Sequence, residues 1–387
     1  MYSVRPCYTS IMLPIIQSPI PPGVIDLGTG EPNPKLFPME LLRNAAQARL
    51  SQDDSYFLQY GAEQGDGYFR LALSKFLERN YTAPMNPENI FITSGASSAL
   101  NLLCTLFAHA GDTIFIEETT FFVAPKIFAD HHLNIVPIAM DENGLLIESL
   151  EENLRIYKPK FLYTIPVHHN PTGTTLTQTR RARLLELAQQ FDFLILADEV
   201  YQLLSFTQAM PKPFATYTDN EKVISLGSFS KILAPGLRLG WLQAHPQIIQ
   251  RLVTSGQLDS GGGMNPFTSA IIRDMVESGD LEKHIDSLVK TYHSRLQKME
   301  SMVRQHFPTV TYNVPKGGYF FWLRFPILVD TKELRQQAKL FKIDFRHGAL
   351  FSSTGGAQNC IRLCFAYYDE AHIEEGFARL KECLANN

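Results

Sequence analysis

A short run around Lys231 contains the residues best suited to covalent chemistry. Within Ser225–Trp241, Ser228 and Ser230 precede the lysine and Arg238 follows it. A lysine amine condenses with an aldehyde, while hydroxyl and guanidinium groups can hold a phosphate. The run therefore predicts a site for a phosphorylated aldehyde cofactor. The alternative is a solvated lysine in a Ser/Gly-rich loop, but the surrounding apolar residues argue against it.

An acidic residue ends a predicted buried strand. Asp198 follows the apolar run 193–197, and Tyr201 lies just beyond it. Ligands of open α/β sheets bind at the carboxyl ends of the strands. A carboxylate there can pair with a cationic ring nitrogen and so keep a cofactor ring acting as an electron sink. A metal-binding Asp-Glu pair and a helix N-cap are the alternatives.

Two turns after predicted strands supply further polar groups. In Asn170–Gly173 the asparagine can bind an oxygen of cofactor or substrate, or the run can be a plain turn. In 93–98 a glycine precedes a predicted helix, whose N-terminus can bind phosphate or simply be capped by serine. His168 and His169 are candidate general bases, but neighbouring side chains point in different directions.

Arg362 lies in the apolar run 359–365, which predicts a strand. A guanidinium in such a place needs an anionic partner, and a carboxylate fits it in a bidentate manner. The partner can be a substrate carboxylate or an acidic residue of the same domain, and the residues alone favour neither.

The composition describes a globular chain of 387 residues, 45% hydrophobic and 19% charged, with a net charge of −4. We expect about two to three domains and no nucleic acid or membrane as partner. The N-terminus lacks a secretory signal pattern. The five cysteines suggest no disulfide framework, and Cys360 and Cys364 lack a second pair for a metal site, so we predict a cytoplasmic protein without metal.

Apolar runs alternate with helical patterns through the middle of the chain. This predicts an α/β fold: a large domain with a mostly parallel seven-stranded sheet flanked by helices, and a smaller α+β domain formed by the N- and C-terminal parts. The expected strands of the large sheet are 89–93, 113–116, 134–138, 161–165, 193–197, 223–226 and 239–244.

The expected domain boundaries follow the change of pattern. Residues 1–45 form an N-terminal segment belonging to the small domain, 46–285 the large cofactor-binding domain, and 286–387 the small C-terminal domain. A long helical pattern over 265–306 connects the two, with a break near Gly279.

Taken together, the motifs resemble those of fold-type I aminotransferases that use pyridoxal phosphate, in the class I/II group of aspartate, aromatic and α-aminoadipate aminotransferases. The match spans nearly the whole chain. The matching stretches are Asp26–Pro32, Tyr60-Gly61, Ser94–Ser97, Asn170–Gly173, Asp198–Tyr201, Ser228–Arg238, Pro315–Phe320 and Arg362.

The resemblance implies the catalytic roles. Lys231 would form a Schiff base with the cofactor and later move a proton between the substrate Cα and the cofactor. Asp198 would pair with the pyridine nitrogen, and Tyr201 and Asn170 would hydrogen-bond the phenolic oxygen. Arg362 would hold the substrate α-carboxylate, and Asn170 would also contact the substrate.

The resemblance also implies the surroundings. Phe121 would stack on the cofactor ring, and Gly30 would lie close to the substrate. Because members of this group are homodimers with shared active sites, Tyr60 would reach the phosphate bound by the neighbouring subunit. The residues implied around the phosphate are Gly95, Ala96, Ser97, Ser228, Ser230 and Arg238.

The chain departs from the family pattern in places. Phe121 stands where the family often has Tyr or Trp, so a hydroxyl is lost. Ala-Ser-Ser follows Gly95 where close relatives have Ser-Gln-Gln, so the expected phosphate contacts of this turn rest on its backbone and not on its side chains. The glycines of Gly261–Gly263 are unusual and suggest a mobile loop near the partner's site.

The resemblance implies an enzyme that transfers the amino group of an L-amino acid to a 2-oxo acid such as 2-oxoglutarate. The apolar N-terminal residues Ile11, Leu13, Ile15 and Ile16 favour aromatic or long aliphatic donors. A carbon–sulfur β-lyase or a cyclopropane-forming synthase of the same fold carries the same motifs. A ligand sensor in a transcription regulator is disfavoured, since we expect too little room for a DNA-binding domain before Asp26.

Overall fold

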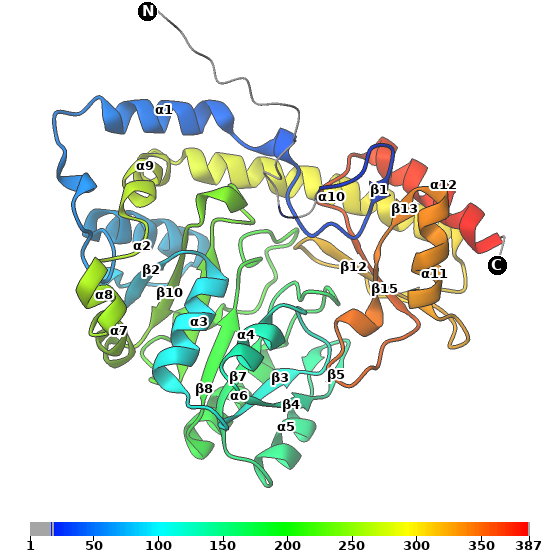
Figure 1. Ribbon diagram of the computed structural model, residues 1–387, viewed down its shortest axis with the longest axis horizontal. Helices are drawn as coiled ribbons and strands as arrows, with labels where there is room; N and C mark the ends of the chain where they lie inside the picture. Colours follow the sequence, from blue (N-terminus) through cyan, green and yellow to red (C-terminus); the bar gives the residue numbers. More distant parts are fainter. Residues whose placement is uncertain (1–16, 18, 386–387) are drawn as a thin grey trace, which may run out of the picture.

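A seven-stranded sheet forms the centre of the computed structural model, which describes residue 17 and residues 19–385 (Figure 1). β10 runs antiparallel to both of its neighbours, while β9, β8, β7, β3 and β4 are mutually parallel. In spatial order the strands are β2 Ile90–Thr93, β10 Gly240–Ala244, β9 Val223–Ser228, β8 Leu194–Asp198, β7 Pro159–Thr164, β3 Thr113–Glu117 and β4 Asn134–Ile138.

Helices cover both faces of this sheet. Successive side chains along a strand therefore pack into different hydrophobic clusters, one on each face. Ile114 and Ile116 of β3 pack in one cluster, whereas Phe115 between them packs in another. Strands buried on both faces are apolar throughout, which is why the sequence predicts them. The helices are α2 Gly67–Tyr81, α3 Ala96–Phe107, α4 Ala124–Asp130, α5 Ile147–Leu154, α6 Gln178–Phe191, α7 Pro246–Val253, α8 Gly256–Gly261 and α9 Pro266–Glu277.

The predicted α/β architecture is confirmed, and the observed strand ends lie within two residues of the predicted ones. Asp198 belongs to β8 itself, since Asp198 pairs with Leu226 of β9. The site residues at the carboxyl ends of β7, β8 and β9 are therefore placed by one rigid sheet.

A second, four-stranded antiparallel sheet has the order β11-β12-β15-β14. The N-terminal part joins this region through β1 (Ile25–Asp26), which pairs in parallel with β13 (Ile343–Asp344). The division at residues 45 and 285 stays a prediction. The other elements are α1 Met39–Leu50, the hairpin β5 Met140–Asp141 and β6 Gly144–Leu145, β11 Thr311–Tyr312, β12 Phe320–Arg324, α11 Thr331–Ala338, β14 Arg346–His347, β15 Cys360–Cys364 and α12 Glu370–Ala385.

The long helical pattern is interrupted where the sequence predicts a break. α9 ends at Glu277 and α10 (Asp280–His306) begins after Gly279, whose φ of 79° suits glycine. α10 runs from α9 toward α12 and so spans the two sheets (Figure 1). Among the described residues, no helix is long and apolar enough to cross a bilayer.

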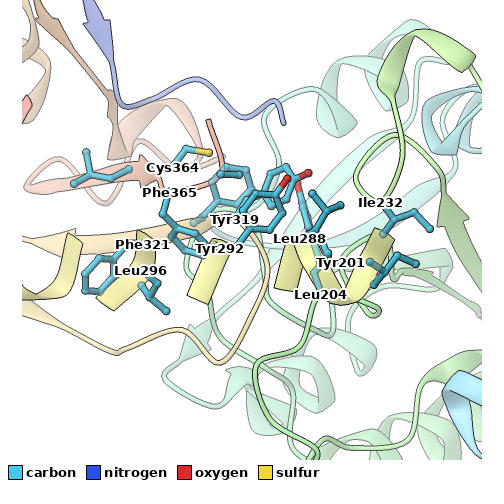
Figure 2. Close-up of a cluster of buried hydrophobic side chains, with 14 of the residues drawn as sticks. Tyr201, Leu204, Ile232, Leu288, Tyr292, Leu296, Tyr319, Phe321, Cys364 and Phe365 are labelled. Carbon is cyan, nitrogen blue, oxygen red and sulfur yellow. The ribbon is translucent and has the colours of Figure 1, made fainter. Parts of the chain in front are cut away.

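The two sheets meet in a buried cluster beside the site (Figure 2). Tyr201 follows β8, Tyr292 comes from α10, and Tyr319 immediately precedes β12. The ring centroids of Tyr201 and Tyr319 are 5.4 Å apart, and those of Tyr292 and Tyr319 are 5.3 Å apart. These contacts fix the position of the small sheet relative to the strand ends of the large one.

Gly262 and Gly263 lie in a loop, as expected, whereas Gly261 is helical. Gly261 is the last residue of α8, and the amide of Gly263 donates to the carbonyl of Gly61 at 2.8 Å. A side chain at 263 would collide with the carbonyl of Ala62, so glycine is needed for close packing. The apolar N-terminal residues Ile11, Leu13, Ile15 and Ile16 lie outside the described residues.

Candidate functional site

Lys231 lies in the turn that follows β9. Phe229 and Ile232 are buried on either side of it and hold the turn against the core. The Lys231 amine donates to the carbonyl of Gly30 at 2.9 Å, and Nζ lies 5.5 Å from the centroid of the Tyr319 ring. Burial lowers the pKa of the Lys231 amine below its ordinary value, and the nearby Arg362 cation acts in the same direction. A lowered pKa favours the neutral amine that a nucleophile requires.

Asp198 is a buried carboxylate with one oxygen bound and the other free. The Tyr163 hydroxyl donates to Asp198 Oδ2 at 2.7 Å, while Oδ1 is buried without a hydrogen-bond partner in the part of the chain described. Burial raises the pKa of Asp198 to about 6, against the lowering effects of the Tyr163 hydroxyl, of the Val200 backbone amide and of the Lys231 charge. A buried acceptor without a partner is costly, so Oδ1 is suited to receive a donor from a ligand.

Asn170 links the strand ends of the large sheet to Arg362. It follows β7 in a buried turn, and its Oδ1 accepts from Arg362 Nη1 at 2.9 Å. Tyr201 is also buried, and its ring contacts the rings of Tyr319 and Phe320 at 5.4 and 5.7 Å. The predicted pair Asn170 and Tyr201 thus lies at the same junction as Arg362.

A buried acidic residue anchors the Asn170 turn. The Glu117 carboxylate at the end of β3 accepts from the Thr164 hydroxyl at 2.6 Å and from the Ile165 amide at 2.9 Å. His169 Nε2 lies 3.0 Å from the same carboxylate. His168 points elsewhere, toward Ser205, and burial lowers its pKa to about 3. Both histidines therefore support the turn, which accords with the expectation that they point apart.

The residues predicted to bind phosphate surround the start of α3. Gly95 precedes the helix with a φ of 91°, and α3 has no side-chain cap. Its first amides are therefore free to bind an anion. The Arg238 guanidinium donates to the carbonyl of Ser94 at 3.0 Å, and a Cβ at position 95 would lie 2.8 Å from Arg238 Nη2. Ser228 is buried at the end of β9, and its hydroxyl accepts from the amide of Ser230 at 3.1 Å.

The Arg362 guanidinium is buried between aromatic rings. Its Cζ lies 4.1 Å from the centroid of the Phe320 ring and 4.8 Å from that of Phe351. Nη2 donates to the carbonyl of Gly28 at 2.6 Å, and Nε has no hydrogen-bond partner within the described residues. No carboxylate of the described residues forms an ion pair with it, and burial lowers its pKa to about 10. A buried cation without a counterion is suited to an anionic ligand.

Of the remaining predicted site residues, Gly30 and Phe121 lie on the Arg362 side of the site, and Tyr60 lies at the surface. A Cβ at Gly30 would lie 3.3 Å from Arg362 Nη2, so glycine leaves the guanidinium accessible. Phe121 follows β3, and its ring contacts that of Phe122 at 5.5 Å. Tyr60 is 85% exposed and lines a surface cavity of about 530 Å³, together with Tyr56 and Tyr68.

Several residues of the site are missing from the sequence prediction. Tyr163 and Glu117 are polar groups near the carboxyl ends of otherwise apolar strands, a pattern that could have singled them out. Phe351 gives no local signal, because it reaches Arg362 only through the packing of the small sheet.

Comparison with known proteins gives consistent matches over the length of the chain. Residues 22–380 match the family model for aminotransferase class I and II. The chain is 35% identical to aromatic-amino-acid aminotransferase 1 of Thermococcus litoralis, over 93% of this chain and 88% of that protein. It is 30% identical to 2-aminoadipate transaminase of Thermus thermophilus, over 94% and 90%. The crystal structure of Pyrococcus horikoshii kynurenine aminotransferase in complex with PMP superimposes with a TM-score of 0.87 at 34% identity, covering 94% of this chain and 91% of that one.

Proposed function

The chain belongs to the class I and II aminotransferases, which use pyridoxal phosphate, and we propose that it transfers the amino group of an aromatic or long aliphatic L-amino acid to a 2-oxo acid such as 2-oxoglutarate. The observation that supports this substrate class is a row of aromatic rings. The row runs from Phe121, which we expect to stack on the cofactor, to Phe351 beside Arg362. Phe121 contacts Phe122 at 5.5 Å, Phe122 contacts Phe351 at 5.5 Å, and Phe351 contacts Trp322 at 5.9 Å. Such rings favour an apolar, planar side chain.

The residues of this chain fit the cofactor. Asp198 Oδ1 lacks a donor, which a protonated pyridine nitrogen would supply. Gly95 leaves space beside the Arg238 guanidinium at the uncapped start of α3, where a phosphate would be bound by amides and a cation. We assign Asp198 to the ring nitrogen, and Gly95–Ser97, Ser228, Ser230 and Arg238 to the phosphate. Phe121 would stack on the ring.

When bound, pyridoxal phosphate supplies the electron-withdrawing ring that makes the substrate Cα–H acidic. Lys231 would hold the aldehyde and then move the Cα proton, because its lowered pKa allows the amine to be neutral. The carbonyl of Gly30 accepts a hydrogen bond from this amine at 2.9 Å and so keeps it close to the substrate position. Asn170 and Tyr201 would hold the phenolic oxygen of the cofactor.

Arg362 would orient the substrate by its α-carboxylate. Phe320 and Phe351 hold the guanidinium in place, and its Nε is free to donate. Fixing the carboxylate fixes which Cα bond stands perpendicular to the cofactor ring, and that choice favours proton loss over other cleavages.

The proposed assembly is a homodimer in which Tyr60 contributes to the partner's site. The support is a set of exposed large apolar side chains in α1, in the segment around Tyr60 and at the starts of α2 and α9, and exposed apolar side chains of this kind mark interaction surfaces. The set is Met39 at 59%, Leu50 at 57%, Tyr56 at 85%, Leu58 at 63%, Tyr60 at 85%, Tyr68 at 71% and Phe267 at 46% exposure.

Mixed dimers test this sharing. A Lys231→Ala subunit paired with a Tyr60→Ala subunit contains one site with both changes and one site with neither. We expect such mixtures to recover activity that neither variant shows alone. Mixtures no more active than the Tyr60→Ala protein itself would contradict the shared site.

We also propose that the enzyme works in the reducing cytoplasm. Cys104, Cys360 and Cys364 are buried thiols without disulfides, and burial raises the pKa of Cys104 to about 12. Such thiols are poor nucleophiles and are suited to a reducing compartment.

A donor panel tests the proposed substrate class. The purified enzyme is supplied with 2-oxoglutarate and one L-amino acid at a time, and glutamate is measured. We expect phenylalanine, tyrosine and leucine to give higher kcat/KM than aspartate or alanine. A preference for aspartate would contradict the role of the aromatic row, although not that of Lys231.

A further inference from the structure

We infer that Tyr163 is a positioning residue for Asp198: its hydroxyl holds one carboxylate oxygen and leaves the other directed at the cofactor ring nitrogen. The inference rests on the proposed role of Asp198. It goes beyond that role by assigning the orientation of the carboxylate to a neighbouring strand. The observation that carries it is the 2.7 Å hydrogen bond from Tyr163 Oη to Asp198 Oδ2, in combination with the unpartnered Oδ1.

The strand register brings the two residues together. Tyr163 of β7 pairs with Leu196 of β8 in the parallel sheet. Side chains two residues apart in a strand project from the same face, so Asp198 lies on the same face as Leu196 and diagonal to Tyr163. The adjacent Thr164 turns its side chain instead to Glu117. The contact is therefore built into the sheet.

The Tyr163 ring has little freedom to move. It is fully buried, and its centroid lies 5.6 Å from that of Phe128 in an edge contact. Burial and the Asp198 charge raise the pKa of Tyr163 well above its ordinary value. The hydroxyl therefore stays protonated and acts as a donor to an ionised carboxylate.

Other ionisable groups face Asp198 and set the background. The Val200 amide and Lys231, from the turn after β9, lower the pKa of Asp198, whereas Glu199, just after β8, raises it; Tyr201 lies just beyond. Glu117 of β3 faces Tyr163 itself. These groups are the same in the wild type and in Tyr163→Phe, which lacks only the hydroxyl. A difference in the pH dependence of the two proteins therefore reports on that hydroxyl.

The inference predicts a change in the pH dependence of cofactor binding. The ionised form of Asp198 is the form that pairs with a protonated ring nitrogen, so affinity decreases as the pH falls through the pKa of Asp198. Loss of a donor to the carboxylate raises that pKa above about 6. In Tyr163→Phe the acidic decline should therefore begin about one pH unit higher, as expected for one hydrogen bond to a charged group.

Equilibrium dialysis of the apoenzyme against pyridoxal phosphate measures this directly, from about pH 5 to about pH 9, a range that brackets the carboxyl. The cofactor phosphate titrates equally with every protein, so only differences between proteins count. The matched control is Tyr217→Phe, which removes a hydroxyl that accepts from Gln178 at 3.0 Å and lies in the short 3-10 helix Phe214–Tyr217, outside the sheet. We expect a shift in Tyr163→Phe and none in Tyr217→Phe.

The inference is wrong if cofactor affinity in a folded Tyr163→Phe protein declines at the same pH as in the wild type. It is also wrong if the decline in Tyr217→Phe shifts by the same amount. If the wild-type apoenzyme itself does not bind the cofactor, the proposed function fails instead. Should Tyr163→Phe not fold, a difluorotyrosine at position 163 provides the opposite test. Its more acidic hydroxyl is a stronger donor, so the decline should move to lower pH, and movement to higher pH or none would contradict the assignment.

Discussion

The two halves of the site are held in different ways. The proposed cofactor half, formed by Asp198, Lys231 and the residues assigned to the phosphate, is placed by the strand ends of one sheet and by the start of α3. The substrate half, formed by Gly30, Phe320, Phe351 and Arg362, comes from separate parts of the chain that meet at the junction of the two sheets. On the proposed roles, one sheet positions the residues that react, and the packed junction between the two sheets selects the amino acid.

If this comparison holds, changes in the two halves give different kinetic signatures. A change in the cofactor half affects all substrates equally and alters cofactor binding. A change in the substrate half alters KM or kcat/KM and leaves the bound cofactor unchanged.

The largest effect is expected for Lys231→Ala. Without the amine neither covalent attachment nor proton movement is possible, so turnover should be lost with every substrate. The phosphate-binding residues and Asp198 are intact, and some cofactor should remain bound without a covalent link. Lys222→Ala is the matched control, because Lys222 lies just before β9 and pairs with Asp192 at the surface. Rates like those of the wild type in Lys231→Ala would contradict the assignment.

A large but smaller effect is expected for Arg362→Lys. Lysine keeps the charge but not the planar, bidentate geometry. The loss of a hydrogen bond to a charged group costs roughly 1.5–3 kcal/mol, so kcat/KM should fall about 10- to 100-fold. The absorbance of bound cofactor should not change. Arg335→Lys, at an ion pair with Asp344, serves as control. An altered cofactor spectrum would mean that the two halves are not separable.

A moderate effect is expected for Phe351→Leu. This change removes one of the two rings that flank Arg362, a contact of about 1 kcal/mol, and should raise KM about fivefold with kcat preserved. The matched control is Phe321→Leu, which removes a ring of the same size that contacts Tyr312 instead of Arg362. If both variants raise KM alike, the effect is one of general packing.

The smallest effect is expected for Glu118→Gln. Glu118 accepts from the hydroxyls of Ser352 and Thr354 and so ties the end of β3 to the loop that carries Phe351. Although burial opposes ionisation, these hydrogen bonds lower the pKa of Glu118 below its ordinary value. The contact between Glu118 and this loop is therefore fully present above the ordinary carboxyl pKa. It is lost as the pH falls through the lowered pKa of Glu118. We expect KM to rise about twofold at neutral pH, as for a half-exposed charged contact, and the difference from wild type to vanish in acid. If KM of Glu118→Gln still differs from that of the wild type in acid, the ionised Glu118 carboxylate is not the cause of the effect.

The same contrast explains what the sequence could reveal. Asp198 ends one apolar strand and Lys231 follows another, so their place at one edge of a sheet can be predicted from the pattern alone. Tyr163 is hidden within a strand, and its partner becomes evident only from the register of β7 and β8. Phe351 and Glu118 depend on contacts between distant segments, and no spacing in the sequence encodes such packing. The predicted roles of Tyr60 and of the N-terminal residues stay predictions, since they depend on a second subunit or on residues outside those described.

The central claim is that Lys231 and Asp198 hold pyridoxal phosphate for transfer of an amino group. Its most direct test is a half-reaction followed by absorbance, in which the purified enzyme loaded with cofactor is mixed with L-phenylalanine and no acceptor. We predict conversion of the bound cofactor to its pyridoxamine form, with phenylpyruvate formed in equal amount, and reversal on addition of 2-oxoglutarate. No conversion with any amino acid, or release of pyruvate and ammonia from a cysteine conjugate without the pyridoxamine form, would contradict the account.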